Sequence, residues 1–336
     1  MARRRLTQQQ RRRIAAQQQG RRNRLREVAV ETLQPAAGSG ADRPGRVITR
    51  HGQHLAVADT GGDLFHCLSR QSIGDPVCGD RVAWHPTGEG QGVVTAILER
   101  RSVLTRPTYG GIDKPLAANI DQLVVVLAVE PEPSAYLLDQ YLVAAANFGI
   151  DAVILFNKSD LIDGARRPAL ERYFAHYRHI GYPLIEASAR SEHGLDSLRS
   201  HLRGRTSILV GQSGVGKSSL INALLPDIEV QIGQLSAASG LGRHTTSTTT
   251  LYHLSEGGDL IDSPGVRSFR LGRLDVRMLE RGFREFGGFI GHCRFSNCSH
   301  DHEPGCALLA ACAEQKIHPQ RLDNFRHMAA ALAQQR

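Results

Sequence analysis

The sequence lacks any long apolar stretch. Residues 123–129, LVVVLAV, form an apolar run of only seven residues, whereas a helix needs about 20 to cross a bilayer. No apolar segment follows the arginine-rich N-terminus, as a secretory signal peptide would require. The composition therefore predicts a cytoplasmic protein with no membrane partner, and we expect a monomer.

Acidic residues are scarce at the N-terminus and balanced by basic residues elsewhere. Residues 1–34 hold ten Arg, no Lys and two Glu, whereas the other 302 residues hold 31 basic and 31 acidic residues. The net charge of +8 therefore belongs to this first segment. Arginine clusters separated by glutamines predict a flexible arm that binds phosphate backbones by counterion release. The alternative is a disordered solubilising extension without a partner.

Cysteines are few and unevenly placed: two lie in the first third, and four lie between residues 293 and 312. In a cytoplasmic chain such a cluster favours a metal site over disulfides. The spacing Cys293-x4-Cys298-x-His300-x5-Cys306 offers three thiolates and one imidazole, which is a ligand set for a closed, structural Zn²⁺ site. Cys312 falls on the helix after Cys306 and is expected to be a buried small apolar residue.

Composition divides the chain into four regions. Residues 1–44 are a basic tail and a linker. Residues 45–110 hold five short β segments separated by Gly, Asp and Pro turns, which predict an OB-fold β-barrel. Residues 111–274 alternate apolar strands with helices, a pattern typical of a doubly wound α/β domain with a mostly parallel sheet. Residues 275–336 predict a helical zinc-binding domain.

A phosphate-binding loop follows a predicted strand and opens a predicted helix. The sequence GQSGVGKS at residues 211–218 fits the P-loop pattern in the context that the motif requires. Its glycines let the backbone N–H groups face phosphate oxygens. Lys217 would reach the β- and γ-phosphates, and the Ser218 hydroxyl would bind Mg²⁺. The predicted phosphate-binding residues are Gly211, Gln212, Ser213, Gly214, Val215, Gly216, Lys217, Ser218 and Ser219.

A guanine-reading motif, NKSD, ends an earlier strand. The Asp160 carboxylate can accept from guanine N1–H and from the exocyclic amine, donors that adenine does not offer in that arrangement. Leaving a buried carboxylate unpaired is costly, so such a site rejects the wrong base. The next strand ends on residues whose backbone N–H would contact guanine O6. The predicted base-binding residues are Asn157, Lys158, Ser159, Asp160, Ser188 and Ala189.

The remaining ligands are expected after the P-loop. In the motif DSPG, Asp262 would hold Mg²⁺ through water, and the Gly265 N–H would contact the γ-phosphate. Residues 236–254 are rich in glycine and hydroxyl groups, which predicts a switch loop that orders with the γ-phosphate. Thr246 is the first choice, and Thr245 the second, to close over Mg²⁺. A polar loop without a role is the alternative.

The residue that orients the attacking water is not evident. Many GTPases place Gln directly after the Gly of this motif, but this chain has Val266, which cannot orient water. We therefore expect slow intrinsic hydrolysis that a partner accelerates, or another residue that supplies the polar contact. His244 precedes the switch threonines and is the catalytic candidate for that contact, with an unremarkable surface histidine as the alternative.

The motifs occur in reversed order, because the base reader precedes the phosphate loop. Moving the chain break around a closed set of strands keeps each motif at its own strand end and changes only where the termini emerge. The nucleotide-binding core here ends directly after DSPG and continues into the C-terminal region. We therefore predict that GTP loading repositions the C-terminal domain.

The motifs NKSD, SAR, GQSGVGKSS, GLGRHTTS, DSPGVRSF and CRFSNCSHDHEPGC together resemble the RsgA (YjeQ/YloQ) family of circularly permuted GTPases. The resemblance runs from about residue 45 to the end, although Ser247 stands where the family commonly has a third Thr. It implies the same four zinc ligands and hydrolysis of GTP. It also implies binding to the small ribosomal subunit and its rRNA late in maturation, with the barrel and the zinc domain contacting rRNA and the ribosome stimulating hydrolysis.

Two other functions are weighed against this one. A GTP-gated RNA-binding switch would act on another RNA or on translation. A zinc-stabilised nucleic-acid-binding protein would carry an inactive P-loop, but the complete set of phosphate and Mg²⁺ ligands argues against it.

Overall fold

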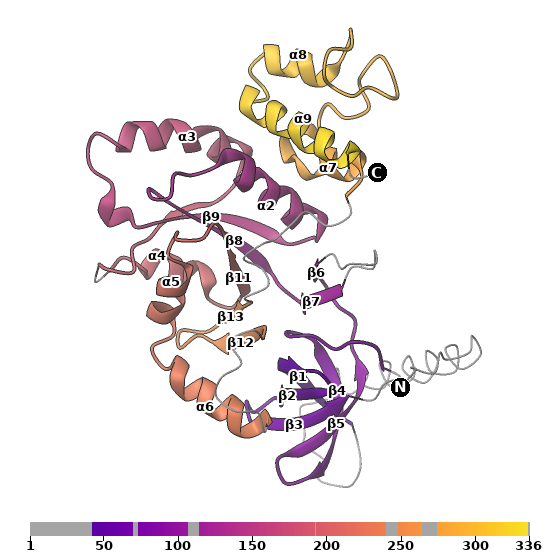
Figure 1. Cartoon of the computed structure of the whole chain (residues 1–336), viewed down its shortest axis with the longest axis vertical. Helices are drawn as coiled ribbons and strands as arrows, with labels where there is room; N and C mark the ends of the chain where they lie inside the picture. The colour runs from indigo at the N-terminus through magenta and orange to yellow at the C-terminus, as the bar shows by residue number, and fades with distance from the viewer. Residues whose placement is uncertain are drawn as a thin grey trace, which may run out of the picture.

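The computed structural model places three regions along the long axis of the molecule (Figure 1). The N-terminal strands form a barrel at one end, an α/β domain lies in the middle, and the C-terminal helices lie at the other end. None of the helices in the described residues is long and apolar enough to cross a membrane. The structure describes residues 42–69, 73–106, 114–191, 193–239, 248–263 and 274–334.

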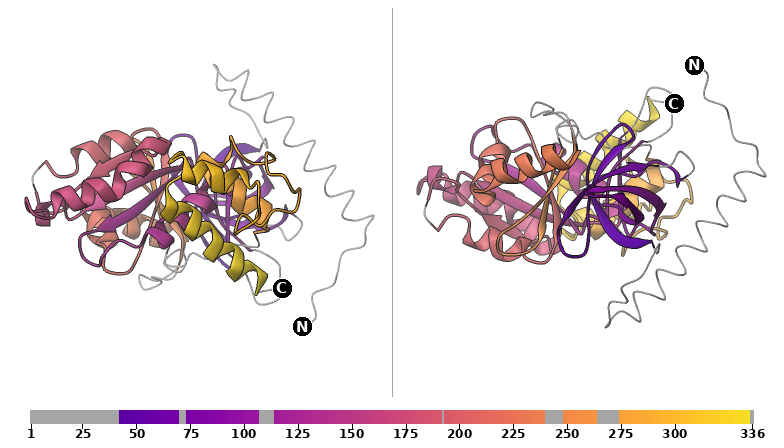
Figure 2. Two further views of the ribbon diagram at one scale, coloured as in Figure 1. Left: turned by 90° about the horizontal axis from the view of Figure 1, so that it is seen from above. Right: turned by 90° about the horizontal axis from the view of Figure 1, so that it is seen from below.

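Five strands close the barrel, as the sequence predicts. They pair in the order β1-β2-β3-β5-β4, and β1 pairs with β4 to close the ring. The view from below shows the strands curled around one another (Figure 2). Trp84 is fully buried at the centre, where a Cβ on Gly92 would lie 2.6 Å from its ring. The strands are β1 (Arg43–His51), β2 (His54–Ala58), β3 (Leu64–Ser69), β4 (Arg81–Gly88) and β5 (Gln91–Ile97).

The α/β domain has the expected mostly parallel sheet. Its strands run in the order β10-β9-β8-β11-β13-β12, and within this domain only the pair β12–β13 is antiparallel. Every residue of β8 is buried, as expected for a strand that is covered on both faces. The strands are β8 (Gln122–Ala128), β9 (Asp151–Asn157), β10 (Leu184–Glu186), β11 (Thr206–Val210), β12 (Thr250–His253) and β13 (Asp259–Asp262).

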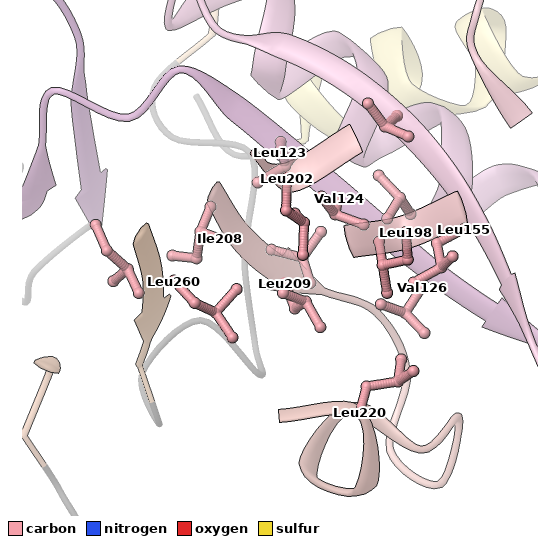
Figure 3. Packing of buried hydrophobic residues seen from close by; sticks show 14 of the residues in the cluster. Leu123, Val124, Val126, Leu155, Leu198, Leu202, Ile208, Leu209, Leu220 and Leu260 are labelled. Carbon is pink, nitrogen blue, oxygen red and sulfur yellow. The ribbon is translucent and has the colours of Figure 1, made fainter. Parts of the chain in front are cut away.

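Helices pack on this sheet through aliphatic side chains. Figure 3 shows leucines, valines and isoleucines of β8, β9, β11 and β13 meeting Leu198 and Leu202 of α4 and Leu220 of α5. This packing holds the strand ends, and therefore the loops that follow them, in fixed positions. The helices are α2 (Ala135–Asn147), α3 (Arg167–Ile180), α4 (Asp196–Leu202), α5 (Lys217–Leu224) and α6 (Ile228–Ser239), with the 3₁₀ turn η2 (Ser159–Leu161).

The barrel and the α/β domain share one hydrogen-bonded sheet. Strand β1 pairs with β12 at Thr49 and Thr250, which makes a sheet of eleven strands. Helix α6 packs on β2 and β3 of the barrel, as Figure 1 also shows. A hairpin of β6 (Val103–Arg106) and β7 (Lys114–Ala118) straddles the predicted boundary at residue 110. The domain limits therefore stay a prediction.

The segment predicted as a switch loop, residues 236–254, is partly regular structure. Helix α6 continues to Ser239, and residues 250–253 form β12. Hydroxyl-rich composition alone does not reveal this strand, because β12 forms by pairing with β13 on one side and with β1 on the other.

The C-terminal helices pack against α2 through a core of their own. A Cβ on Gly282 would lie 2.6 Å from Val143 of α2, so α7 approaches α2 closely. Phenylalanines at 283, 286 and 325 fill the interior of this region. The elements are α7 (Val276–Gly282), η4 (Arg284–Phe286), α8 (Ala307–Ala313) and α9 (Pro319–Ala333).

Candidate functional site

The phosphate loop begins where β11 ends, and its shape requires glycine. Gly211, Gly214 and Gly216 have φ angles of 143°, 85° and 93°, which side chains rarely adopt. A Cβ on Gly211 would lie 2.2 Å from the Val126 carbonyl oxygen, and one on Gly216 would lie 2.4 Å from Nδ2 of Asn157. The loop therefore passes closely between β8 and the end of β9.

Lys217 opens α5 and folds its side chain over the same loop. Its Nζ donates to the carbonyl oxygens of Gly211 at 2.7 Å and Gln212 at 2.6 Å. The first turn of α5 also carries the exposed hydroxyls of Ser218 and Ser219. An ammonium group, a helix N-terminus and glycine-rich backbone thus converge where an anion such as phosphate is favoured.

Asn157 ties the predicted base-reading loop to the predicted phosphate loop. It is 2% exposed at the end of β9, and its Nδ2 donates to the Val215 carbonyl at 2.8 Å. Lys158 has a left-handed φ of 58°, and its Nζ donates to the Glu130 carbonyl at 2.7 Å. Motifs that are separate in the sequence are therefore in direct contact, although their order is reversed.

Asp160 faces the loop that follows β10. The hydroxyl of Ser188, which is 1% exposed, donates to Asp160 Oδ1 at 2.5 Å and accepts from the Arg190 N–H at 3.1 Å. The Ser159 N–H donates to the Ala187 carbonyl at 3.0 Å, which joins the two loops. The Asp160 carboxylate is thereby oriented by a neighbour that itself is held in place.

These loops enclose a cavity of about 160 Å³. Two of its lining residues were not among the predicted base-binding residues: Leu161, which directly follows NKSD, and Arg190, the last residue of the SAR motif. The Oδ1 of Asn157 is buried without a partner among the described residues, so the cavity holds an acceptor that fits a ligand donor. The lining residues are Asn157, Lys158, Asp160, Leu161, Ser188, Ala189, Arg190, Gly216 and Ser219.

Asp262 lies at the same edge of the sheet as the phosphate loop. Strand β13 runs parallel to β11 with Ile261 opposite Ile208, so both strands end at this edge. Just beyond, the hydroxyls of Ser263 and Thr249 lie 2.8 Å apart, which joins the ends of β12 and β13. The predicted switch and catalytic residues His244, Thr245, Thr246, Gly265 and Val266 lie outside the described residues.

The four predicted metal ligands form a cluster in which all ligand atoms lie within 4.8 Å of one another. The Cys293 Sγ lies 3.6 Å from His300 Nδ1 and 4.0 Å from Cys306 Sγ, and the last two atoms are 3.3 Å apart. Cys298 completes the set. A tetrahedral ion with bonds of about 2.3 Å to sulfur needs ligands about 3.8 Å apart, so this donor set fits zinc.

Glu280 supports the cluster from α7, and sequence reasoning missed it. Its Oε1 lies 3.2 Å from Nε2 of His300, which leaves Nδ1 facing the sulfurs. Carboxylates commonly hold metal-binding histidines in this way. No local spacing signals the pair, because Glu280 lies on a separate helix. Cys312 is outside the cluster and packs against the core of the C-terminal region.

The chain is similar in sequence to a known family of GTPases. A model of the RsgA GTPase family matches residues 97–272. The small ribosomal subunit biogenesis GTPase RsgA of Pseudomonas aeruginosa is 46% identical over 90% of this chain and 89% of its own length. The protein with the same description from Pseudomonas syringae pv. syringae is 45% identical over 99% of each chain.

Two solved structures share the fold. The crystal structure of YjeQ from Thermotoga maritima is 32% identical, has a TM-score of 0.73, and covers 87% of this chain and 99% of its own. The structure of YloQ, described as a circularly permuted GTPase, is 27% identical, has a TM-score of 0.73, and covers 90% and 99%. The description of YloQ as circularly permuted agrees with the reversed motif order of this chain.

Proposed function

The chain belongs to the RsgA GTPase family, and we propose that its hydrolysis of GTP serves late maturation of the small ribosomal subunit. Membership makes it a GTPase, a hydrolase that acts on GTP with Mg²⁺. The relatives are named for small-subunit biogenesis, and these names favour this role over a switch that acts on another RNA.

One observation supports a single nucleotide site: the 2.8 Å hydrogen bond from Asn157 to the Val215 carbonyl. It holds the base-reading loop against the phosphate loop, so one GTP can reach both. In the proposed site Asp160 accepts from guanine N1–H and the exocyclic amine, and Ser188 orients that carboxylate. Asn157 and Lys158 fix the loop and flank the base, and the Ala189 backbone faces guanine O6.

The phosphate end follows from the P-loop. We assign the triphosphate to the backbone of residues 211–219 and to Lys217, whose ammonium already lies on the loop. Mg²⁺ would be held by Ser218, Asp262 and Thr246, and it would neutralise charge on the transferring phosphoryl group. The Gly265 N–H is proposed to contact the γ-phosphate, and His244 is proposed to contact the attacking water. The site would then accelerate hydrolysis by positioning the reactants and by stabilising the charge on the transferring phosphoryl group.

Zinc is the proposed occupant of the Cys293, Cys298, His300 and Cys306 cluster. With four protein ligands and no open position, its role would be structural, and binding would contribute to folding. A strong chelator should therefore lower the melting temperature of the zinc-loaded protein. An unchanged melting temperature after the metal is shown to be removed would exclude this role.

RNA contact is proposed for the basic arm at residues 1–34, for the barrel and for the zinc-binding region. The arm carries the whole net charge of the chain, and phosphate backbones attract such segments. We propose a monomer with the domain limits 1–44, 45–110, 111–274 and 275–336.

The decisive experiment compares GTP hydrolysis rates with small subunits, large subunits and free RNA. The proposal predicts strong stimulation by small subunits alone, since Val266 cannot orient water and intrinsic hydrolysis is expected to be slow. Equal stimulation by any RNA would instead support a general RNA switch. Absence of turnover under every condition would contradict GTPase function.

A further inference from the structure

Phe295 is an aromatic side chain left in water beside the zinc cluster. It is 42% exposed, and the other large exposed hydrophobic residues among those described are aliphatic or Met. The segment between η4 and α8, which contains it, lies at the outer end of the molecule, far from the barrel (Figure 1). One exposed apolar residue is ordinary by itself, so its neighbours decide whether it has a role.

Arg294 accompanies the ring. Its guanidinium carbon lies 5.5 Å from the Phe295 ring centroid, within the range of a cation–π contact. Arg294 is exposed, and no carboxylate in the described part of the chain pairs with it. The charge is therefore available to an anion from outside the chain, next to a free aromatic face.

Several contacts hold the loop that carries both side chains. Cys293 and Cys298 anchor its two ends in the metal cluster. The Arg294 N–H donates to the Gly305 carbonyl at 3.0 Å, and the Cys298 N–H donates to the Phe295 carbonyl at 3.3 Å. A Cβ on Gly305 would lie 2.9 Å from Cβ of Arg294, so the two backbone segments are in close contact. A partner would therefore pay little ordering cost on binding.

The chemistry of this loop suits single-stranded RNA. Residues 291–297 contain no acidic side chain, and all except half-buried Cys293 are exposed. An aromatic face stacks on an unpaired base of any sequence, and an adjacent guanidinium binds phosphate. Duplex RNA keeps its base faces stacked and offers only its backbone. Ser296 and Asn297 add exposed hydrogen-bonding groups.

We propose that Phe295 stacks on an unpaired RNA base and that Arg294 binds a neighbouring phosphate. The inference rests on the proposed function for its expectation of an RNA partner. It adds which side chains of the zinc loop make the contact and which form of RNA they select.

The test measures binding of the zinc-loaded full chain to a single-stranded RNA oligonucleotide and to a duplex of equal length, by fluorescence anisotropy. Phe295→Ala should weaken single-strand binding about tenfold and leave duplex binding unchanged. Arg294→Ala should weaken single-strand binding and reduce the salt dependence by about one phosphate contact. Because the basic arm is proposed to bind both RNAs, the ratio of the two affinities is the quantity compared.

Val230→Ala on α6 and Arg172→Ala on α3 are matched controls, since both residues are exposed. Zinc content and melting temperature of each variant show that the loop is intact. Phe295→Trp should retain single-strand binding, because its ring still stacks.

An unchanged affinity ratio for Phe295→Ala would overturn the inference. So would unchanged RNA binding together with weaker binding to small subunits, because this result would indicate a protein contact. Neither result would contradict the proposed function in small-subunit maturation. That proposal fails only if small subunits do not stimulate GTP hydrolysis by the wild type.

Discussion

Single residues decide how the two halves of the proposed nucleotide site meet. Asn157 donates to the phosphate loop, and Gly216 has no side chain at the point where that loop passes Asn157. Asp160, which lines the same cavity, accepts a hydrogen bond from the Ser188 hydroxyl. Each contact depends on one atom, so single substitutions should separate base recognition from phosphate binding.

Base selectivity should depend on Asp160. Asp160→Asn replaces one acceptor with an amide donor that opposes the guanine amine, so GTP affinity should fall at least about 100-fold. Xanthosine triphosphate, which has a carbonyl at that position, should bind the variant better than GTP does. Titration with fluorescent nucleotides measures both affinities. Asp163→Asn changes an exposed carboxylate three positions away, and a comparable loss in that control would contradict the assignment.

Phosphate binding should depend on Gly216. In Gly216→Ala the new Cβ would meet Nδ2 of Asn157 at 2.4 Å, and φ is 93°. The loop must shift and break the bond to Val215, so GTP binding should be lost, with a stability cost of about 1–3 kcal/mol. Gly233→Ala on α6, where nothing lies within 4 Å, is the control and should be close to neutral. Normal nucleotide affinity in Gly216→Ala would disprove this account of the loop.

At the scale of elements, two helices meet through a histidine pair. His176 on α3 stacks on His318, the residue that precedes α9, with ring centroids 4.2 Å apart and planes 13° apart. Both ring nitrogens of His176 are buried without a partner among the described residues. Burial lowers the pKa of His176 to about 4, and the positive charges of His318 and Arg321 act in the same direction.

Acid should therefore loosen the contact between α3 and α9. Below a pH of about 6.5, His176 is protonated in the unfolded chain but stays neutral in the folded chain. The free energy of unfolding should therefore fall as the pH drops from about 6.5 towards 4. His176→Asn should lose less stability over this range than the wild type does. Urea unfolding at several pH values measures the difference. His179→Asn, on an exposed position of the same helix, should behave like the wild type.

At the scale of the whole molecule, the two ends of the chain attach to the α/β domain in different ways. The barrel continues the central sheet through β1 and β12, while a buried ionic network holds the C-terminal helices. In that network Arg321 is fully buried and pairs with Asp139 of α2 and with Glu285. Tyr177 of α3 donates to the same aspartate at 2.8 Å.

This network bears on the prediction that GTP loading repositions the C-terminal domain. Any such movement relative to α2 must separate Arg321 from Asp139, which is costly because both are buried. By contrast, α6 and β12, the elements on either side of residues 240–247, both contact the barrel. Repositioning of the C-terminal domain stays a prediction that scattering of GDP and GTP-analogue forms can test.

Removing the buried cation should destabilise the assembly of the two domains. Arg321→Met leaves Asp139 buried without its partner, so the free energy of unfolding should fall by about 3–5 kcal/mol. Denaturant unfolding of the zinc-loaded protein measures this loss. Arg172→Met, on an exposed position of α3, should change stability by less than about 0.5 kcal/mol. If both variants were equally stable, the network would not hold the domains together.

Local sequence determined the elements and the motif chemistry of this protein. Each motif can be recognised from a few neighbouring residues, because backbone conformation and ligand chemistry are local. The examples are the glycine spacing, the carboxylate after a buried strand, and the three cysteines near a histidine. The barrel strands, the parallel sheet and the metal cluster could all be predicted for this reason. The strand character of residues 250–253 could not, because it depends on partners that are distant in the chain.

Only the tertiary structure decided which distant groups meet. Asn157 with Val215, Glu280 with His300, and Arg321 with Asp139 are separated by 58, 20 and 182 positions. No local pattern relates them, since such contacts arise when packed strands and helices bring their ends together. The reversed motif order has the same explanation. The sequence sets which motifs the chain contains, and the pairing of the strands sets where in space each motif lies.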